Sequence, residues 1–174
     1  LDQSLKRMNL DYVDIFYHHR MDPDTPLYET MWALDQIVKS GKALYVGLSN
    51  YDGKTMKEAS DILKELRCPF VINQNRYSIY DRNVETNGIL NAANEYKKGM
   101  IIFSPLAQGL LTDRYLYGIP SDSRVAMGSR FLKESSVKPE LVEKSAKLNE
   151  IAKNRGQSLA QMALSWVYAH EGIT

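Results

Sequence analysis

Apolar positions follow two different spacings along the chain, and their alternation predicts repeated strand–helix units. Short apolar runs with β-branched and aromatic residues, typical of buried strands, occur at Tyr12–Tyr17, Leu44–Leu48, Phe70–Ile72 and Met100–Phe103. Between these runs, apolar residues recur every three or four positions, which predicts helices from Pro26 to Gly41, from about Lys54 to Arg67, and near Glu85–Lys98. The strands begin near positions 12, 43, 70 and 100. The repeat is therefore about 30 residues long, which is the size of a βαβ unit.

Near-continuous apolar strands that alternate with amphipathic helices predict an α/β fold with a parallel sheet. Four such units are half of the eight in a (β/α)8 TIM barrel. The chain begins at Leu1 inside an amphipathic pattern and ends at Thr174 where a further strand would follow. We therefore expect residues 1–174 to be a single domain that is part of a longer protein. A flavodoxin-like, doubly wound domain that is complete in itself is the alternative.

Two local signals predict where helices begin. Thr25 is expected to be the N-cap of the first full helix, with Pro26 at its first helical position. Beyond Ser104 the repeat gives way to a long segment, Leu106–Ser136, and segments of this length in compact domains are usually functional or disordered. Two helices are expected after it, from about Pro139 to Asn154 and from Leu159 to His170, the second preceded by a Ser158/Gln161 capping box.

The composition is that of an ordinary globular protein and excludes several classes of partner. The hydrophobic content is 44%, the charged content is 25% and the net charge is +1. This balance gives no electrostatic reason to expect nucleic acid or an anionic membrane as a partner. The single cysteine, Cys68, excludes an internal disulfide and fits a reducing compartment, so we expect a cytoplasmic protein. A homo-oligomer is compatible with the sequence.

Each predicted strand ends in polar residues. These residues are His18-His19-Arg20, Ser49-Asn50, Gln74-Asn75-Arg76 and Ser104. Because the carboxyl ends of parallel strands in a barrel converge on one face, we expect these groups to line a common site. Any one of them alone carries little weight, since turns favour Ser and Asn in any case.

The candidate chemistry is that of hydrogen bonding and proton movement. If its strand continues, His18 and His19 point to opposite faces, and His19 is the better candidate for the site. Two histidines without cysteine or paired carboxylates do not predict a metal site. No glycine-rich phosphate motif is present, so any phosphate contact would come from the loop's arginines, for which the alternative is a solvated loop. Phe103 could stack on a planar ring or belong to the core.

Four collinear segments resemble the aldo-keto reductases. They are Tyr12–Arg20 (YVDIFYHHR), Gly41–Tyr51 (GKALYVGLSNY), Asn73–Tyr77 (NQNRY) and Phe103–Leu111 (FSPLAQGLL). The resemblance spans the chain, and the stretch Gly118–Arg124 is more similar to the branch that holds bacterial glyceraldehyde-3-phosphate reductases and potassium-channel β subunits. It implies a (β/α)8 barrel that binds NADP, of which this chain covers about strands 4 to 7.

The resemblance also implies roles for individual residues. His19 matches the catalytic histidine that orients the substrate carbonyl. Ser49, Asn50 and Gln74 match the residues that hold the nicotinamide carboxamide, and Phe103 takes the place of the aromatic residue that stacks on the ring. The remaining cofactor-binding positions are Ser104, Pro105, Leu106, Ala107 and Gln108 on the pyrophosphate side and Arg114 and Arg124 on the adenosine phosphate side.

The implied activity is NADPH-dependent reduction of an aldehyde or ketone by hydride transfer. A small aldose, glyceraldehyde phosphate or methylglyoxal is the implied type of substrate. The family's catalytic Tyr, Lys and Asp lie on strands outside this chain, so we expect residues 1–174 by themselves to be inactive. The alternative is a nucleotide-binding regulatory subunit like the potassium-channel β subunits.

Overall fold

The computed structural model describes all residues, 1–174, as two compact units. The first unit holds residues 1–76, 83–103 and 172–174, and the second holds residues 77–82 and 104–171. That both belong to a single domain stays a prediction.

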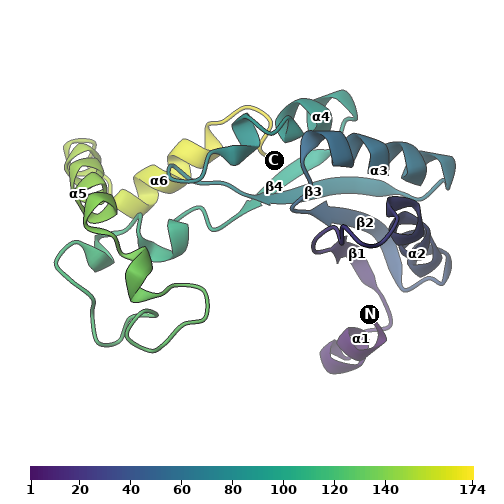
Figure 1. The fold of residues 1–174 in the computed structure, drawn as a ribbon, viewed down its shortest axis with the longest axis horizontal. Coiled ribbons are helices and arrows are strands. Elements are labelled where there is room, and N and C mark those ends of the chain that lie inside the picture. The colour runs from purple at the N-terminus through teal and green to yellow at the C-terminus, as the bar shows by residue number, and fades with distance from the viewer. The chain divides into compact units, whose positions relative to one another are not determined.

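The first unit is a four-stranded parallel sheet with helices between its strands (Figure 1). Its elements are α1 (Asp2–Met8), β1 (Val13–His18), α2 (Leu27–Lys39), β2 (Ala43–Ser49), α3 (Gly53–Glu65), β3 (Phe70–Arg76), the 3-10 turn η1 (Asn83–Glu85), α4 (Ile89–Glu95) and β4 (Gly99–Phe103). The strands lie in the order β1-β2-β3-β4, and every neighbouring pair is parallel. The predicted parallel α/β sheet is confirmed. Its order has no reversal, whereas a doubly wound sheet reverses its strand order at a switch point.

Helices α2, α3 and α4 cover one face of this sheet, and α3 and α4 lie side by side (Figure 1). The predicted apolar stripes account for the packing. The fully buried side chains of this layer include Met31, Leu34, Met56, Ala59, Leu63 and Ile89 on the helices and Val46, Leu48 and Met100 on the strands. Each helix therefore sits on the sheet through residues spaced at three or four positions.

Thr25 is not the N-cap of α2. The cap is Pro26, whose extended backbone (φ −52°, ψ 131°) precedes the first helical residue, Leu27. The Thr25 hydroxyl instead donates to the Asp22 carboxylate at 2.8 Å. The preceding acidic turn therefore engages the side chain that would have capped the helix. The end of α2 agrees with expectation, since Gly41 follows its C-cap with φ +74°.

Strand β3 is longer than its apolar run predicts. It continues past Ile72 to Arg76, because Asn73, Gln74 and Asn75 pair along the backbones of the flanking strands. Helix α4 is shorter than predicted, because Gly88 stands in the left-handed region (φ +80°) and becomes its N-cap. Gly99 is the first residue of β4.

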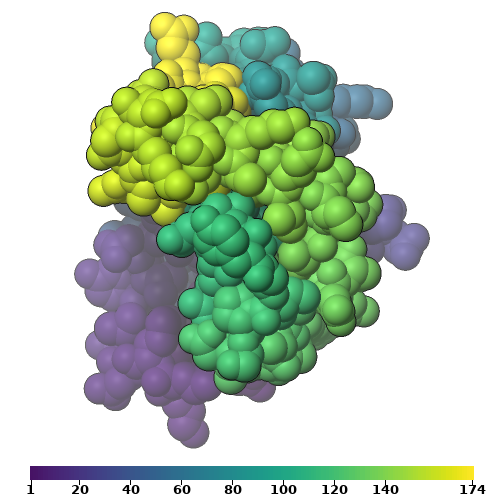
Figure 2. Space-filling view, turned by 90° about the vertical axis from the view of Figure 1, so that its left-hand side faces the viewer, coloured from purple at the N-terminus to yellow at the C-terminus, as the bar shows by residue number.

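The second unit is built from short turns and two helices. They are the 3-10 turns η2 (Ala107–Gly109), η3 (Asp113–Tyr115) and η4 (Glu134–Ser136), then α5 (Pro139–Asn154) and α6 (Leu159–Tyr168). In Figure 2 the loop segment, teal to green, lies against the lighter green α5. Ser145 of α5 joins the two, because its hydroxyl donates to the Leu110 carbonyl at 2.7 Å and lies 2.7 Å from the Tyr80 hydroxyl. The predicted Ser158/Gln161 capping box is present at α6.

None of the helices combines the length and the apolar character needed to cross a lipid bilayer.

Gly53 allows α3 and α4 to begin against each other. A Cβ atom on Gly53 would lie 2.4 Å from the carbonyl carbon of Gly88, and the Gly53 N–H donates to the Asn87 carbonyl at 3.0 Å. We predict that Gly53→Ala lowers the free energy of unfolding by about 1–3 kcal/mol, because the obstacle is backbone and cannot rotate away. Urea denaturation of the full-length protein measures this. The control Lys54→Ala, at the exposed neighbouring position, should leave the midpoint unchanged, and equal midpoints for both variants would contradict the prediction.

Candidate active site

The carboxyl ends of β2 and β3 bring two of the predicted residues together. Ser49 is paired with Gln74 in the parallel register. One step further across the sheet, Arg76 is paired with Phe103 at the end of β4. Since alternate residues of a strand share a face, Ser49, Gln74 and Phe103 lie on the same face of the sheet. Gly47 lies on the same face, where it is paired with Tyr17. A Cβ atom at this position would lie 2.5 Å from the Tyr17 ring, so the ring occupies the space above the glycine. This face is the one that the three helices do not cover.

Asn50 connects the ends of three strands. Its backbone N–H donates to the Gln74 carbonyl at 2.9 Å, and its side-chain Nδ2 donates to the His19 carbonyl at 2.9 Å and to Ser49 Oγ at 3.1 Å. The residue has a left-handed backbone, with φ +61°. Asn is one of the few residues with a side chain that tolerates this conformation. Four predicted site residues are thus linked to one another by hydrogen bonds.

Two of these four keep their side chains available. Neither the Gln74 carboxamide nor the His19 imidazole makes a hydrogen bond within the first unit, and His19 is exposed. Asn50 differs, since both Nδ2 hydrogens are used and Oδ1 remains as an acceptor. Gln74 therefore offers a ligand both a donor and an acceptor, whereas Asn50 offers an acceptor only.

His18 belongs to the opposite face of β1. Its Nδ1 lies 2.8 Å from the hydroxyl of Tyr51, a buried residue that follows β2, and the two rings meet edge to face. Burial lowers the pKa of His18, and the neighbouring His19 lowers it further. Burial also raises the pKa of Tyr51 to about 12. Both groups are therefore held uncharged, and His18 supports the strand end rather than facing a ligand.

Phe103 has a cationic neighbour on its own face of the sheet. The guanidinium carbon of Arg76 lies 5.7 Å from the centre of the Phe103 ring, within the range of a cation–π interaction. Phe103 as a whole is only partly buried.

The longer segment of the second unit, residues 104–171, begins with a strained stretch of backbone. Ser104, Ala107 and Gln108 all have positive φ angles, of 57°, 46° and 60°. The turn is held by backbone bonds from Ala107 N–H to the Ser104 carbonyl and from Leu111 N–H to the Leu106 carbonyl. Non-glycine residues in this region cost energy and cluster where a ligand is held. Pro105 and Leu106 complete the segment, and all five residues are partly buried.

The two predicted arginines differ in their surroundings. Arg114 forms an ion pair with Asp122 at 3.0 Å and also donates to the Asp122 backbone carbonyl. Arg124 is exposed next to the buried Ser123. Arg114 is thus held in place by its own loop, whereas the Arg124 side chain projects from the surface of its unit.

Sequence reasoning missed Tyr51 and Asn73 as parts of the site, and it expected Asn75 among the groups that line it. All three are buried on the helix-covered side of the sheet, directly behind the candidate residues. Their spacing carried a signal, since Asn73 and Asn75 alternate with Gln74 and so had to face the other way if β3 continued.

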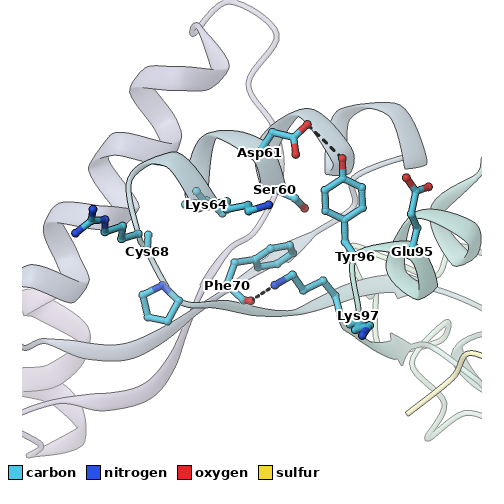
Figure 3. A pocket seen from close by; sticks show the side chains of 12 residues that line it. Ser60, Asp61, Lys64, Cys68, Phe70, Glu95, Tyr96 and Lys97 are labelled. Atoms are coloured by element: carbon cyan, nitrogen blue, oxygen red, sulfur yellow. Dashed lines mark hydrogen bonds between the residues drawn. The ribbon is translucent and has the colours of Figure 1, made fainter.

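A groove of about 650 Å³ in the first unit lies away from these residues (Figure 3). It opens where α3 and α4 end and β3 begins, and Asp61, Lys64, Cys68 and Tyr96 are among its lining residues. Burial raises the pKa of the Cys68 thiol to about 11, so the thiol stays protonated and weakly nucleophilic. Sites in parallel α/β folds lie at the carboxyl ends of the strands, so this groove is not the candidate active site.

Comparison with known proteins supports the same conclusion as the motifs. The profile of the aldo/keto reductase family matches residues 1–174. The chain belongs to the aldo/keto reductase family. It is 46% identical over 179 aligned residues to L-glyceraldehyde 3-phosphate reductase of Escherichia coli K12, and 34% identical over 174 residues to a probable voltage-gated potassium channel subunit beta of Oryza sativa subsp. japonica. The corresponding subunit of Arabidopsis thaliana is 35% identical over 176 residues.

A solved structure extends this aldo/keto reductase assignment to the fold. The thermostable aldo-keto reductase Tm1743, crystallised with the inhibitor epalrestat, is similar with a TM-score of 0.71 and 28% identity over 99% of this chain. The chain covers 51% of the Escherichia coli reductase, 53% of each plant subunit and 52% of the Tm1743 chain. It therefore spans about half the length of these relatives. The predicted fold class, part of an aldo-keto reductase barrel, is confirmed.

The lowered pKa of His18 predicts a pH dependence of stability. The unfolded chain binds a proton near the ordinary value of 6.5, whereas the folded protein resists it, so stability should fall as the pH drops below 6.5. Urea denaturation of the full-length protein between pH 5 and 8 measures this loss. It should be smaller in His18→Gln and unchanged in the control His170→Gln. An identical pH profile for wild type and His18→Gln would contradict the prediction.

Proposed function

We propose that the full-length protein is an oxidoreductase that uses NADPH to reduce an aldehyde or ketone. The observation that carries this proposal is the meeting of Ser49, Asn50 and Gln74 at the carboxyl ends of neighbouring strands, with Gln74 unpaired. Membership of the aldo/keto reductase family supports the same class of reaction.

The donor set at the strand ends suits a nicotinamide carboxamide. That group is neutral and has one carbonyl acceptor and two N–H donors. Gln74 supplies both a donor and an acceptor, Asn50 supplies Oδ1, and Ser49 supplies a hydroxyl. A phosphate would be poorly held by these uncharged groups. Phe103, which is only partly buried, would stack on the nicotinamide ring.

The phosphates of NADPH would be held by the second unit. We assign the pyrophosphate to the backbone of Ser104–Gln108, where strained residues turn the chain sharply. Arg114 and Arg124 would contact the adenosine phosphate, because Arg forms bidentate bonds with phosphate oxygens. Asp122 holds the Arg114 guanidinium in advance, which reduces the entropy lost on binding.

His19 would act on the substrate. When bound, NADPH supplies the hydride, so that a carbonyl compound, NADPH and a proton give an alcohol and NADP⁺. The exposed His19 imidazole can donate a hydrogen bond to the carbonyl oxygen and stabilise its developing negative charge. The proton that completes the alcohol would come from an acid other than the candidate site residues of this chain. A small aldose, a glyceraldehyde phosphate or methylglyoxal is the proposed type of substrate, and the single buried cysteine fits a cytoplasmic setting.

A nucleotide-binding regulatory subunit is the second candidate. Its support is the 34% and 35% identity of this chain to the plant potassium channel subunits. It ranks second because the identity to the reductase is higher, at 46%. Turnover separates the two. Rapid NADPH oxidation with methylglyoxal or glyceraldehyde phosphate supports the enzyme, whereas cofactor binding without turnover of any carbonyl compound supports the regulatory subunit.

Gln74→Ala tests the nicotinamide site. We predict that it weakens NADPH binding by about 1–2 kcal/mol, roughly tenfold in Kd, because it removes a donor and an acceptor. It should leave the stability within about 0.5 kcal/mol, since the carboxamide makes no internal hydrogen bond. Fluorescence titration gives Kd, and Gln36→Ala on the exposed side of α2 is the control. An unchanged Kd in Gln74→Ala would argue against the assignment.

Arg124→Ala tests the phosphate site. The loss of one charged contact to the adenosine phosphate should weaken NADPH binding by about 1.5–3 kcal/mol. Binding of NADH, which lacks that phosphate, should change little, so the preference for NADPH should fall. Titration with both cofactors measures the ratio, and Arg130→Ala, whose guanidinium lies over Phe131, serves as the control. Equal weakening of both cofactors would place Arg124 elsewhere.

A further inference from the structure

Asn75 occupies a buried position directly behind the candidate cofactor site. It is 6% exposed and lies on β3 next to Gln74, but on the opposite face of the strand. Its Oδ1 accepts from the Asn50 backbone N–H at 3.1 Å and from Asn73 Nδ2 at 2.8 Å. Its Nδ2 donates to the Tyr51 carbonyl at 2.9 Å. The Asn75 carboxamide thus forms hydrogen bonds with both ends of the Asn50–Tyr51 dipeptide, at the Asn50 N–H and at the Tyr51 carbonyl.

The orientation of this carboxamide is set by its partners. The groups that meet Oδ1 are both donors, and the group that meets Nδ2 is an acceptor. A flipped amide would set N–H against N–H and oxygen against oxygen. Since the partners include two backbone groups of fixed position, only one orientation satisfies them.

The backbone of Asn50 depends on these hydrogen bonds more than the backbone of its neighbours does. Its left-handed backbone, with φ +61°, is a minor conformation for a residue with a side chain. That conformation aims its side chain at the His19 carbonyl and Ser49 Oγ. The bond from Asn50 N–H to the Gln74 carbonyl fixes one point only, whereas Asn75 fixes a second point at Tyr51.

We propose that Asn75 is a positioning residue for cofactor binding, which holds the Asn50 side chain in place through the Asn50 N–H and the Tyr51 carbonyl. This inference rests on the proposed function, because it takes Asn50 as a cofactor contact. Asn75 itself touches no cofactor, and its effect passes entirely through the β2–α3 turn. The bond between His18 and the Tyr51 hydroxyl anchors the same turn from β1.

A double-mutant cycle in the full-length protein tests the proposal. The variants are Asn75→Ala, Asn50→Gly and the pair, and Gly is chosen at position 50 because it accepts a positive φ without strain. The readouts are the Kd for NADPH, the KM for NADPH and kcat at saturating cofactor. Ser60→Ala, which removes another buried hydrogen bond from the same unit, is the control for a general loss of stability.

The expected result is a rise of about tenfold in the NADPH Kd for Asn75→Ala, as for the loss of one net hydrogen bond. KM for NADPH should rise with it, kcat should change less, and Ser60→Ala should leave both unchanged. In the Asn50→Gly background, Asn75→Ala should add little, because the contact that it positions is already gone. Asn75→Ser keeps a small polar group on β3, but its short hydroxyl cannot bond to both Asn50 N–H and the Tyr51 carbonyl, so it should also raise the Kd and serves as the test if the Ala variant does not fold.

The contrary results have different meanings. If Asn50→Gly leaves the NADPH Kd unchanged, the cofactor role of Asn50 fails and the proposed function loses that contact. If Asn50→Gly weakens binding but Asn75→Ala does not, or if the two effects add in full, the positioning role alone is overturned. A loss of affinity in Ser60→Ala equal to that in Asn75→Ala would also overturn it, since the effect would then be one of stability.

Discussion

The parallel register of β2 and β3 is the constraint on which the candidate site depends. It sets Ser49 opposite Gln74 and brings the Asn50 N–H within 2.9 Å of the Gln74 carbonyl. A shift of one residue would move Gln74 to the helix-covered face and bring the neighbouring asparagines to the open one. The apolar core is buried in this alignment, since Val46, Leu48 and Met100 are fully buried between the strands and the helices that cover them. The core therefore determines which polar groups a ligand meets.

The two faces of the same strands serve different purposes at their ends. On the open face, Gln74 and His19 keep unpaired side chains, whereas on the covered face both the Oδ1 and the Nδ2 of Asn75 are hydrogen-bonded. A buried carboxamide is costly when unpaired, so such a network is stable only when its bonds are made together. Asn73 is an exception in this network, since its Oδ1 is buried without a hydrogen-bond partner. That deficit weakens the network locally, and the other bonds of Asn73 and Asn75 offset it.

Hydrophobic spacing predicted most of the fold, and it failed where polar residues make structure. The four strands, α1, α2, α3, α5 and the capping box of α6 follow from apolar periodicity and local caps. The extension of β3 could not be read in the same way, because Asn and Gln disfavour strands and only tertiary pairing holds them there. The length of α4 was misjudged because the positive φ of Gly88 overrides an amphipathic pattern that continues through it. Thr25 shows that a good capping residue can be engaged by a neighbouring turn.

The sequence predicted which residues make up the candidate site, but it did not predict which of them bond to the protein and which remain available to a ligand. Asn50 and Gln74 carry the same functional group, and both follow the rule that polar residues end parallel strands. Only the hydrogen bonds distinguish them, since Asn50 uses both of its N–H groups on the protein and Gln74 uses none. Substitution at Asn50 therefore changes the shape of the site as well as its contacts, whereas substitution at Gln74 removes contacts alone. A loss of cofactor affinity at position 74 is for this reason the more direct evidence for binding, and a loss at position 50 has to be read together with Asn75.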